Sequence, residues 1–251
     1  MTRSIRRRLA EKGVGASEGF RWRGSKEVSR LEGLSDAVFA FAITLLVVSL
    51  EVPKTFDELM MAMRGFFAFS ICFALLFSIW YQQYVFFRRY GLEDLFVVWM
   101  NAILIFVVLF YVYPLKFLFT GLVDRLLGFP PRHGGIPPLA SFDQLRILML
   151  VFGAGYVAVF LLFFLLYRHA DRRREQLELN EVERLHTRES IWTSLLQVFV
   201  GVASLLIAGF GGPRSAPWAG IIYMANGPLQ AMRGMYWGRR RRLVQTRVAA
   251  G

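Results

Sequence analysis

The stretch 30–50, RLEGLSDAVFAFAITLLVVSL, determines how the rest of the chain must be interpreted. The apolar run 34–52 would measure about 28 Å at the helical rise, which is enough to cross the hydrocarbon core of a bilayer. Yet the run begins with Ser35 and Asp36 and holds Thr44 in its middle. Ionisable side chains in membrane helices are costly, so they count as candidate functional residues from the start.

Five more apolar blocks follow, and 55% of the residues are hydrophobic. This pattern predicts an all-α integral membrane protein with six transmembrane helices in each subunit. The third block is expected to end at Pro114, before a loop rich in Gly and Pro. The sixth contains Gly227-Pro228, which would kink it. The six expected spans cover 34–52, 65–87, 95–113, 147–167, 190–210 and 217–237.

The basic residues lie in the gaps between the apolar blocks. There are 30 Lys and Arg against 18 Asp and Glu, for a formal charge of +12. Because these residues follow the membrane pattern, they indicate topology rather than a nucleic-acid surface. With a cytoplasmic N-terminus, 23 of the 30 fall on the cytoplasmic side, in 1–30, 83–94, 168–188 and 233–251. We therefore predict that both termini are cytoplasmic, which requires an even number of spans.

The chain divides into three parts on this interpretation: a basic cytoplasmic tail 1–29, a six-helix domain 30–237 and a basic cytoplasmic tail 238–251. The leader has no apolar region of its own, so we expect a partly disordered tail rather than a cleavable signal. A lone cysteine, Cys72, excludes a disulfide within the chain. No metal site and no bound cofactor are expected, because the three histidines have no ligand spacing. They are His133, His169 and His186.

Helical spacing gives the first span two different polar sides. Four residues at i, i+3, i+4 and i+7 share one face: Phe41, Thr44, Leu45 and Val48. Asp36 lies about 140° away from Phe41 on the wheel. One side would therefore bind neighbouring helices through Ser35 and Asp36, and the other would present Thr44 among bulky apolar groups.

The first of these sides is expected to form a helix clasp. Trp80 and Gln83, late in the second block, and Asn101 in the third lie at about the depth of Asp36. Their polar hydrogens can satisfy a buried carboxylate, and such interhelical bonds stabilise by about 1 kcal/mol each. Arg30 would add a charge partner. The predicted clasp network comprises Arg30, Ser35, Asp36, Trp80, Gln83 and Asn101; a functional role for Asp36 and a purely structural one both remain open.

The second side allows two interpretations of Thr44. A lone threonine in a membrane helix usually bonds the carbonyl four residues earlier. A bulky apolar face interrupted by one hydroxyl also suits a pore, where symmetry turns each residue into a ring and apolar constrictions gate by dewetting.

The stretch 30–50 resembles the first helix of the lysosomal/endosomal transmembrane potassium channel family, in its short prokaryotic branch. That family carries an Arg-x-x-x-Phe-Ser-Asp signature, matched here by Arg30, Leu34 in place of Phe, Ser35 and Asp36. Thr44 follows eight residues after the aspartate, as in the family. Trp80 and the run 99–101, Trp-Met-Asn, resemble further family positions. The resemblance rests on motifs in the first three blocks and only on hydropathy and spacing in the others.

The resemblance implies a homotetramer around a central potassium-permeable pore lined by the first helix. Carried over by position, Phe41, Leu45 and Val48 would form the narrow apolar layers and Thr44 a polar layer. Two positions depart from the family. Phe41 replaces the usual Ile or Leu at the main constriction, and Gln83 and Tyr84 stand where the second span usually carries histidines.

We therefore expect a potassium-permeable cation channel in the bacterial inner membrane, acting by passive permeation and contacting lipid, potassium ions and copies of itself. One alternative is a proton-coupled secondary transporter in which Asp36 titrates. Another is a non-conducting membrane scaffold whose basic tails bind anionic lipid. An enzyme is not expected, because the sequence has no phosphate-binding loop and no Ser–Lys or Ser–His pair at a plausible depth.

Overall fold

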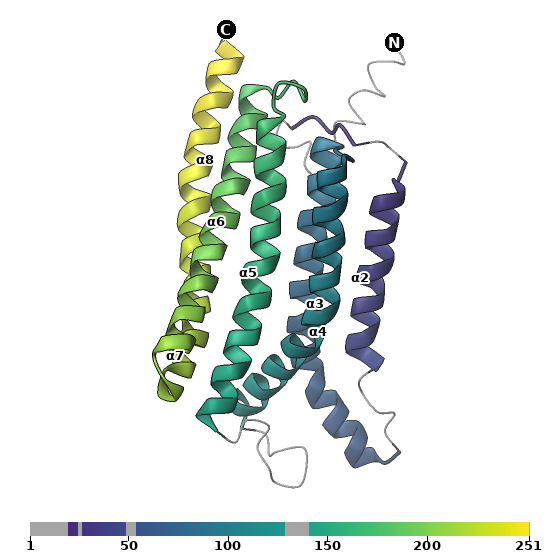
Figure 1. The fold of residues 1–251 in the computed structure, drawn as a ribbon, viewed down its shortest axis with the longest axis vertical. Helices are drawn as coiled ribbons and strands as arrows, with labels where there is room; N and C mark the ends of the chain where they lie inside the picture. The colour runs from purple at the N-terminus through teal and green to yellow at the C-terminus, as the bar shows by residue number, and fades with distance from the viewer. Residues whose placement is uncertain (1–19, 25–26, 49–53, 129–140, 251) are drawn as a thin grey trace.

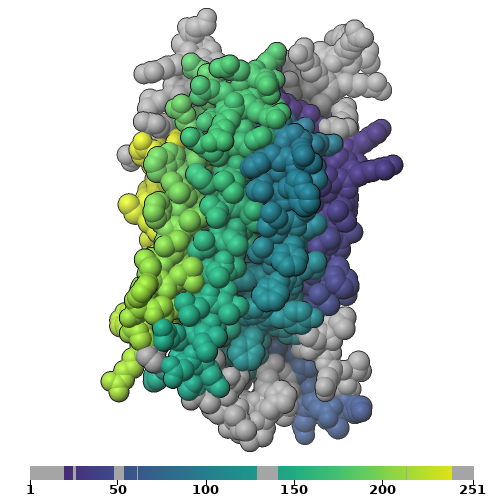
Figure 2. All heavy atoms as spheres, in the orientation of Figure 1, coloured from purple at the N-terminus to yellow at the C-terminus, as the bar shows by residue number. Residues whose placement is uncertain are grey.

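The computed structural model describes residues 20–24, 27–48, 54–128 and 141–250, and every regular element in these ranges is helical. Figure 1 shows one elongated bundle in which α2 and α8 lie on opposite flanks. Figure 2 shows the face formed by α4, α5 and α6 between them. The helices are α2 (Arg30–Val48), α3 (Phe56–Tyr90), α4 (Leu95–Leu126), α5 (Phe142–Arg172), α6 (Glu181–Phe210), α7 (Ala216–Ile221) and α8 (Asn226–Ala250), with short 3-10 turns η2 (Pro213–Ser215) and η3 (Ile222–Ala225) around α7.

The all-helical prediction is confirmed. By length and composition, four of the described helices can each cross a membrane: α3, α4, α5 and α6. They are longer than the apolar blocks because their capping residues lie outside those blocks. Asn180 and Glu183 form a capping box at the start of α6, and Gly91 ends α3 in the left-handed conformation at φ 58°. The predicted loop around 129–140 and the end of the first block, 49–52, lie outside the described residues.

The predicted end of the third span at Pro114 is wrong, since α4 continues through Pro114 to Leu126. A proline removes one backbone hydrogen bond and bends a helix rather than always ending it. In Figure 1 the last turns of α4 leave the direction of its first part. The consequence is that Lys116, expected in a loop, lies on a helix that packs against α2.

The sixth apolar block, 217–237, is not one helix. It is divided into α7, the 3-10 turn η3 and α8. The interruption therefore falls one turn before the expected position. Gly227 and Pro228 lie in the first turn of α8, where proline is tolerated because the N–H that it lacks would have no partner there.

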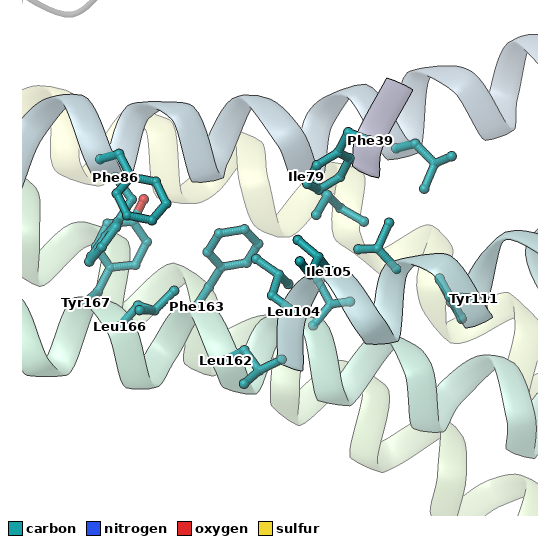
Figure 3. Close-up of a cluster of buried hydrophobic side chains, with 14 of the residues drawn as sticks. Phe39, Ile79, Phe86, Leu104, Ile105, Tyr111, Leu162, Phe163, Leu166 and Tyr167 are labelled. Carbon is teal, nitrogen blue, oxygen red and sulfur yellow. The ribbon is translucent and has the colours of Figure 1, made fainter. Parts of the chain in front are cut away.

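Large side chains fill the core between α3, α4 and α5. Figure 3 shows Phe86 and Tyr167 facing each other, and their ring centroids are 5.5 Å apart in an edge-on arrangement. Where α4 meets α5, a Cβ added at Gly155 would come within 2.3 Å of the Tyr111 ring. Only glycine permits this approach, as is common where membrane helices pack closely. Cys72 is buried in the same core.

Residues 20–24, here called the leader segment, pack against the bundle, whereas the sequence predicted a partly disordered tail over 1–29. The backbone N–H groups of Arg23 and Gly24 donate to the Arg88 carbonyl near the end of α3, at 3.2 and 3.1 Å. A Cβ on Gly24 would lie 2.8 Å from the Phe87 carbonyl oxygen, so this residue must be small. Phe20 is buried, edge-on to Tyr90 at 5.6 Å. Hydropathy could not predict this docking because it depends on contacts with α3 and α6.

A buried carboxylate on α6 binds the two arginines of the leader segment and so holds this segment against the bundle. The Glu183 side chain is fully buried and accepts a 2.6 Å bond from Arg23 Nη2 and a 2.8 Å bond from the Arg21 backbone N–H. Burial raises the pKa of Glu183, but these hydrogen bonds, the backbone N–H of Asn180 and the charge of Arg23 outweigh it. The net pKa lies below the ordinary 4.5. The ion pair therefore stabilises the fold fully above that value and is lost as pH falls through the lowered pKa.

We predict that Glu183→Gln lowers the free energy of unfolding by about 1–3 kcal/mol at neutral pH, because Arg23 loses its charged acceptor. The variant should also lose part of the acid sensitivity of the wild type. Thermal unfolding of the purified protein from neutral pH down to values below 4.5 measures both effects. Glu181→Gln, an exposed neighbour on the same turn of α6, is the matched control. Equal melting curves for wild type and Glu183→Gln would contradict the role of the leader segment.

Candidate functional site

Helix α2 packs on one side and leaves the other side uncovered by its own chain. Its contacts with the bundle come from one stripe of buried residues, Ser35, Phe39, Ala42 and Leu46. Phe41, 57% exposed, and the exposed Thr44 lie on the opposite side. This arrangement follows from spacing, because residues three or four apart share a face of a helix.

Of the face predicted for Phe41, Thr44, Leu45 and Val48, the structure shows a part. Phe41 and Thr44 lie at its centre, whereas Leu45 lies at its edge and packs partly against the core. Val48 ends α2, and its side chain lies outside the described part of the structure. The Thr44 hydroxyl donates to the Ala40 carbonyl at 2.9 Å, as expected for a lone threonine in a helix. Its oxygen keeps acceptor capacity and stays on the exposed face.

The buried half of the predicted clasp is a continuous chain of hydrogen bonds across three helices. Gln83 on α3 donates to the Asn101 side-chain oxygen on α4. Asn101 Nδ2 donates to Ser35 Oγ on α2 at 2.8 Å, and Ser35 donates to the Leu31 carbonyl at 2.9 Å. Asn101 is fully buried, so each amide must find its partner within the protein.

Of the three residues proposed to satisfy Asp36, Trp80 bonds to it and the two amides do not. The Trp80 indole N–H on α3 donates to Asp36 Oδ1 at 2.7 Å, on the more exposed side of α2. The amides of Gln83 and Asn101 bond to each other instead. Arg30 is exposed and forms no hydrogen bond or ion pair with the described clasp residues. The predicted network is therefore two separate links, and Arg30 belongs to neither in the single chain.

A small hollow lies beside Asp36 at the N-terminal end of α2. Gln83 and Arg88 belong to its lining on the α3 side, and Glu32 belongs to it on the α2 side. Asp36 therefore borders a space that joins the two links of the clasp. The full lining is Val28, Glu32, Asp36, Gln83, Tyr84, Phe87 and Arg88.

Trp80 belongs to a row of aromatic rings along α3 that the sequence analysis missed. Successive rings lie 5.2 to 6.1 Å apart from Phe69 to Tyr84. The row comprises Phe69, Phe73, Phe77, Trp80 and Tyr84. The detectable signal was aromatic residues repeating every three or four positions on one helix. This row fixes the Trp80 ring that holds Asp36.

The C-terminal end of α2 is held by a residue that sequence reasoning placed elsewhere. Lys116 Nζ on α4 donates to the Leu46 carbonyl at 2.9 Å. The last four carbonyls of a helix have no intrahelical partner, and a cation near them is favoured by the helix dipole. A helix that ends at Pro114 would place Lys116 in a loop, so the sequence pattern does not predict this contact.

A second ion-pair group joins α4 to α5 outside the apolar blocks. Asp94, the N-cap of α4, lies 2.8 Å from His169 Nε2 and 3.4 Å from Arg173 Nη1 at the end of α5. Burial raises the pKa of Asp94, but the hydrogen bonds from His169 and from the Val97 backbone outweigh it and the net pKa is lowered. His186 is buried near Glu189, and His133 lies outside the described residues. Among the described residues, no group of three or more His, Cys, Asp or Glu can hold a metal ion.

Comparison with known proteins places this site in a family. The profile described as "Endosomal/lysosomal potassium channel TMEM175" matches residues 30–111. A potassium channel of Marivirga tractuosa is 39% identical over 253 residues, covering 95% of this chain and 99% of the relative. The chain belongs to the TMEM175 family. A potassium channel of Chamaesiphon minutus is 27% identical over 152 residues, 57% of this chain and 66% of the relative.

The fold agrees with that assignment. A crystal structure of a threonine-to-alanine variant of the potassium channel MtTMEM175, in complex with a nanobody–MBP fusion, matches with a TM-score of 0.76 at 39% identity. The match covers 88% of this chain and 97% of that one. The TMEM175 family is a family of ion channels rather than enzymes. The matched residues 30–111 contain both links of the clasp and the uncovered face of α2.

We predict that Asn101→Leu lowers the free energy of unfolding by about 1–3 kcal/mol, because the buried Gln83 amide loses its acceptor and Ser35 Oγ loses its donor. Thermal unfolding of the purified protein measures the loss. Gln82→Leu is the control, since Gln82 is partly exposed and makes only a 3.4 Å bond to its own helix at Ser78. Similar losses in the two variants would show that the interhelical chain is dispensable.

Proposed function

We propose that the protein is a potassium-permeable channel and that the uncovered face of α2 lines its pore. One observation carries the proposal: the face that bears Phe41 and Thr44 is exposed in the single chain, although it belongs to the part that the family profile matches. A large apolar side chain exposed in that position needs a function outside the chain's own core. The full-length relative in Marivirga is named a potassium channel.

The assembly that we propose is a homotetramer in the bacterial inner membrane, with both termini in the cytoplasm. Each subunit would cross the membrane six times, by α2, α3, α4, α5, α6 and the interrupted segment from α7 to α8. The four long apolar helices and the distribution of Lys and Arg support this topology. A two-part sixth crossing is compatible with lipid where neighbouring helices satisfy the exposed backbone.

Permeation would be passive, through rings of the same residue from each subunit. Phe41 would form the apolar constriction, with Leu45 and Val48 as further apolar layers. An apolar ring resists wetting, so its width sets whether ions pass. Thr44 would offer one oxygen in each subunit one helical turn from Phe41. The clasp and Lys116 would hold α2 at the depth and rotation that this geometry requires.

A proton-coupled transporter remains a second candidate because Asp36 is exposed and one of its carboxylate oxygens is bonded by Trp80. In that mechanism the flux would saturate and vanish in Asp36→Asn. In the channel that we propose, Asp36→Asn weakens the Trp80 link and leaves passive flux in the protein that assembles. The family assignment and the full-length channel relative favour the channel over a non-conducting scaffold.

We predict that Phe41→Ala raises potassium flux several-fold, because it replaces the widest apolar side chain of the constriction with a methyl group. The measurement uses liposomes containing the purified oligomer, with a potassium gradient and then a sodium gradient. Phe106→Ala and Phe199→Ala are matched controls, since these phenylalanines are 69% and 63% exposed but lie on α4 and α6. They should leave flux unchanged.

The two gradients distinguish the candidates. Potassium flux above sodium flux that rises only in Phe41→Ala supports a potassium-selective pore lined by α2. Unchanged flux in an assembled Phe41→Ala protein would overturn the assignment of α2 to the pore. Absence of flux in both wild type and Phe41→Ala would overturn the channel itself.

A further inference from the structure

Arg233 on α8 carries a charge for which the described chain provides no carboxylate. Its Nη1 donates to the Thr193 hydroxyl on α6. Its Nε is buried and, within the ranges that the structure describes, has no hydrogen-bond partner. Glu189, one turn along α6, lies instead by His186, at 3.9 Å. An arginine keeps its charge and has five N–H donors; with Nε buried and one Nη1 hydrogen on Thr193, the other hydrogens of Nη1 and Nη2 are the donors left for a ligand.

The surroundings of Arg233 are those of a helix that faces lipid. On α8, Met232 and Tyr236 flank Arg233 and are exposed, whereas Trp237, one turn further on the same face, is buried; Trp192, next to Thr193 on α6, is exposed. Tryptophan and tyrosine are enriched where a membrane meets water. α8 packs on α6 and lies on the flank of the bundle opposite α2 (Figure 1). A ligand for Arg233 would therefore approach from the lipid, away from the proposed pore.

The depth of Arg233 fits the headgroup region. The basic run 239–242 begins six residues further along α8, about 9 Å at the helical rise. Arg233 thus lies just inside the most basic part of the helix, within reach of a phosphate through its long side chain. Thr193 orients the guanidinium, because its own hydroxyl donates to the Glu189 carbonyl at 2.7 Å and so turns its lone pairs towards Arg233.

We propose that Arg233 binds the headgroup phosphate of an anionic phospholipid at the contact between α6 and α8, beside Trp192 and Tyr236. The planar guanidinium matches two phosphate oxygens. An anionic lipid is preferred over a zwitterionic one because its headgroup carries no cation of its own and the basic run 239–242 adds attraction. We place this lipid in the cytoplasmic leaflet, which rests on the topology in the proposed function; the lipid contact itself does not.

The test is thermal unfolding of the assembled protein in two kinds of vesicle, phosphatidylcholine alone and phosphatidylcholine with phosphatidylglycerol in equal parts. We expect phosphatidylglycerol to raise the melting temperature of the wild type and Arg233→Gln to lose most of that rise. Arg214→Gln, at an exposed arginine near the other end of α6, should keep the rise. Soluble glycerol phosphate added to phosphatidylcholine vesicles should not reproduce it.

An equal rise in wild type and Arg233→Gln would overturn the proposal, and an equal effect of glycerol phosphate would overturn the lipid as its source. If Arg233→Gln does not fold, Arg233→Lys is measured in its place. A smaller rise in melting temperature than in the wild type supports binding of two phosphate oxygens by the guanidinium, and an undiminished rise contradicts it. Because the measurement needs no conduction, a protein that shows the lipid effect but carries no potassium would overturn the proposed function alone.

Discussion

Every polar group of α2 that faces the bundle must find its hydrogen bond inside the protein, because lipid offers none. The chain from Gln83 through Asn101 to Ser35 meets this requirement and also fixes which side of α2 is buried. A rotation of α2 by one residue, about 100°, would break the Asn101 bond and expose the serine. The uncovered face with Phe41 and Thr44 is thus determined by the bonds on the opposite side.

The two ends of α2 are held by different chemistry. At the C-terminal end, Lys116 bonds the Leu46 carbonyl and opposes the helix dipole. Just before the N-terminal end, the leader segment is tied to α6 by the ion pair between Arg23 and Glu183. Because residues 20–24 precede α2 closely in the chain, this pair links the start of α2 to α6. Acid that protonates Glu183 would loosen this link.

Local spacing was enough to predict the faces of α2, since Ser35, Asp36 and Thr44 lie within one helix whose geometry is regular. It could also name Trp80 and Asn101 as residues near Asp36. It could not pair them correctly, because the choice between indole and amide as donor to Asp36 depends on how α3 and α4 are rotated. The continuation of α4 past Pro114 and the docking of the leader segment were missed for the same reason, since neighbouring helices provide the compensating contacts.

Three ionisable side chains in or beside the apolar blocks each need a partner for their charge, and they find it in different ways. Asp36 is matched by the Trp80 indole and Lys116 by the last carbonyls of α2, both from within the chain. Among the described residues, Arg233 bonds only a neutral hydroxyl, and α8 lies on the flank opposite α2. The free-energy cost of a charge in this environment is highest where no opposite charge lies nearby. An arginine at this position therefore implies a counter-charge from outside the chain. On the lipid-facing flank of a membrane protein, the available counter-charge is a phospholipid phosphate.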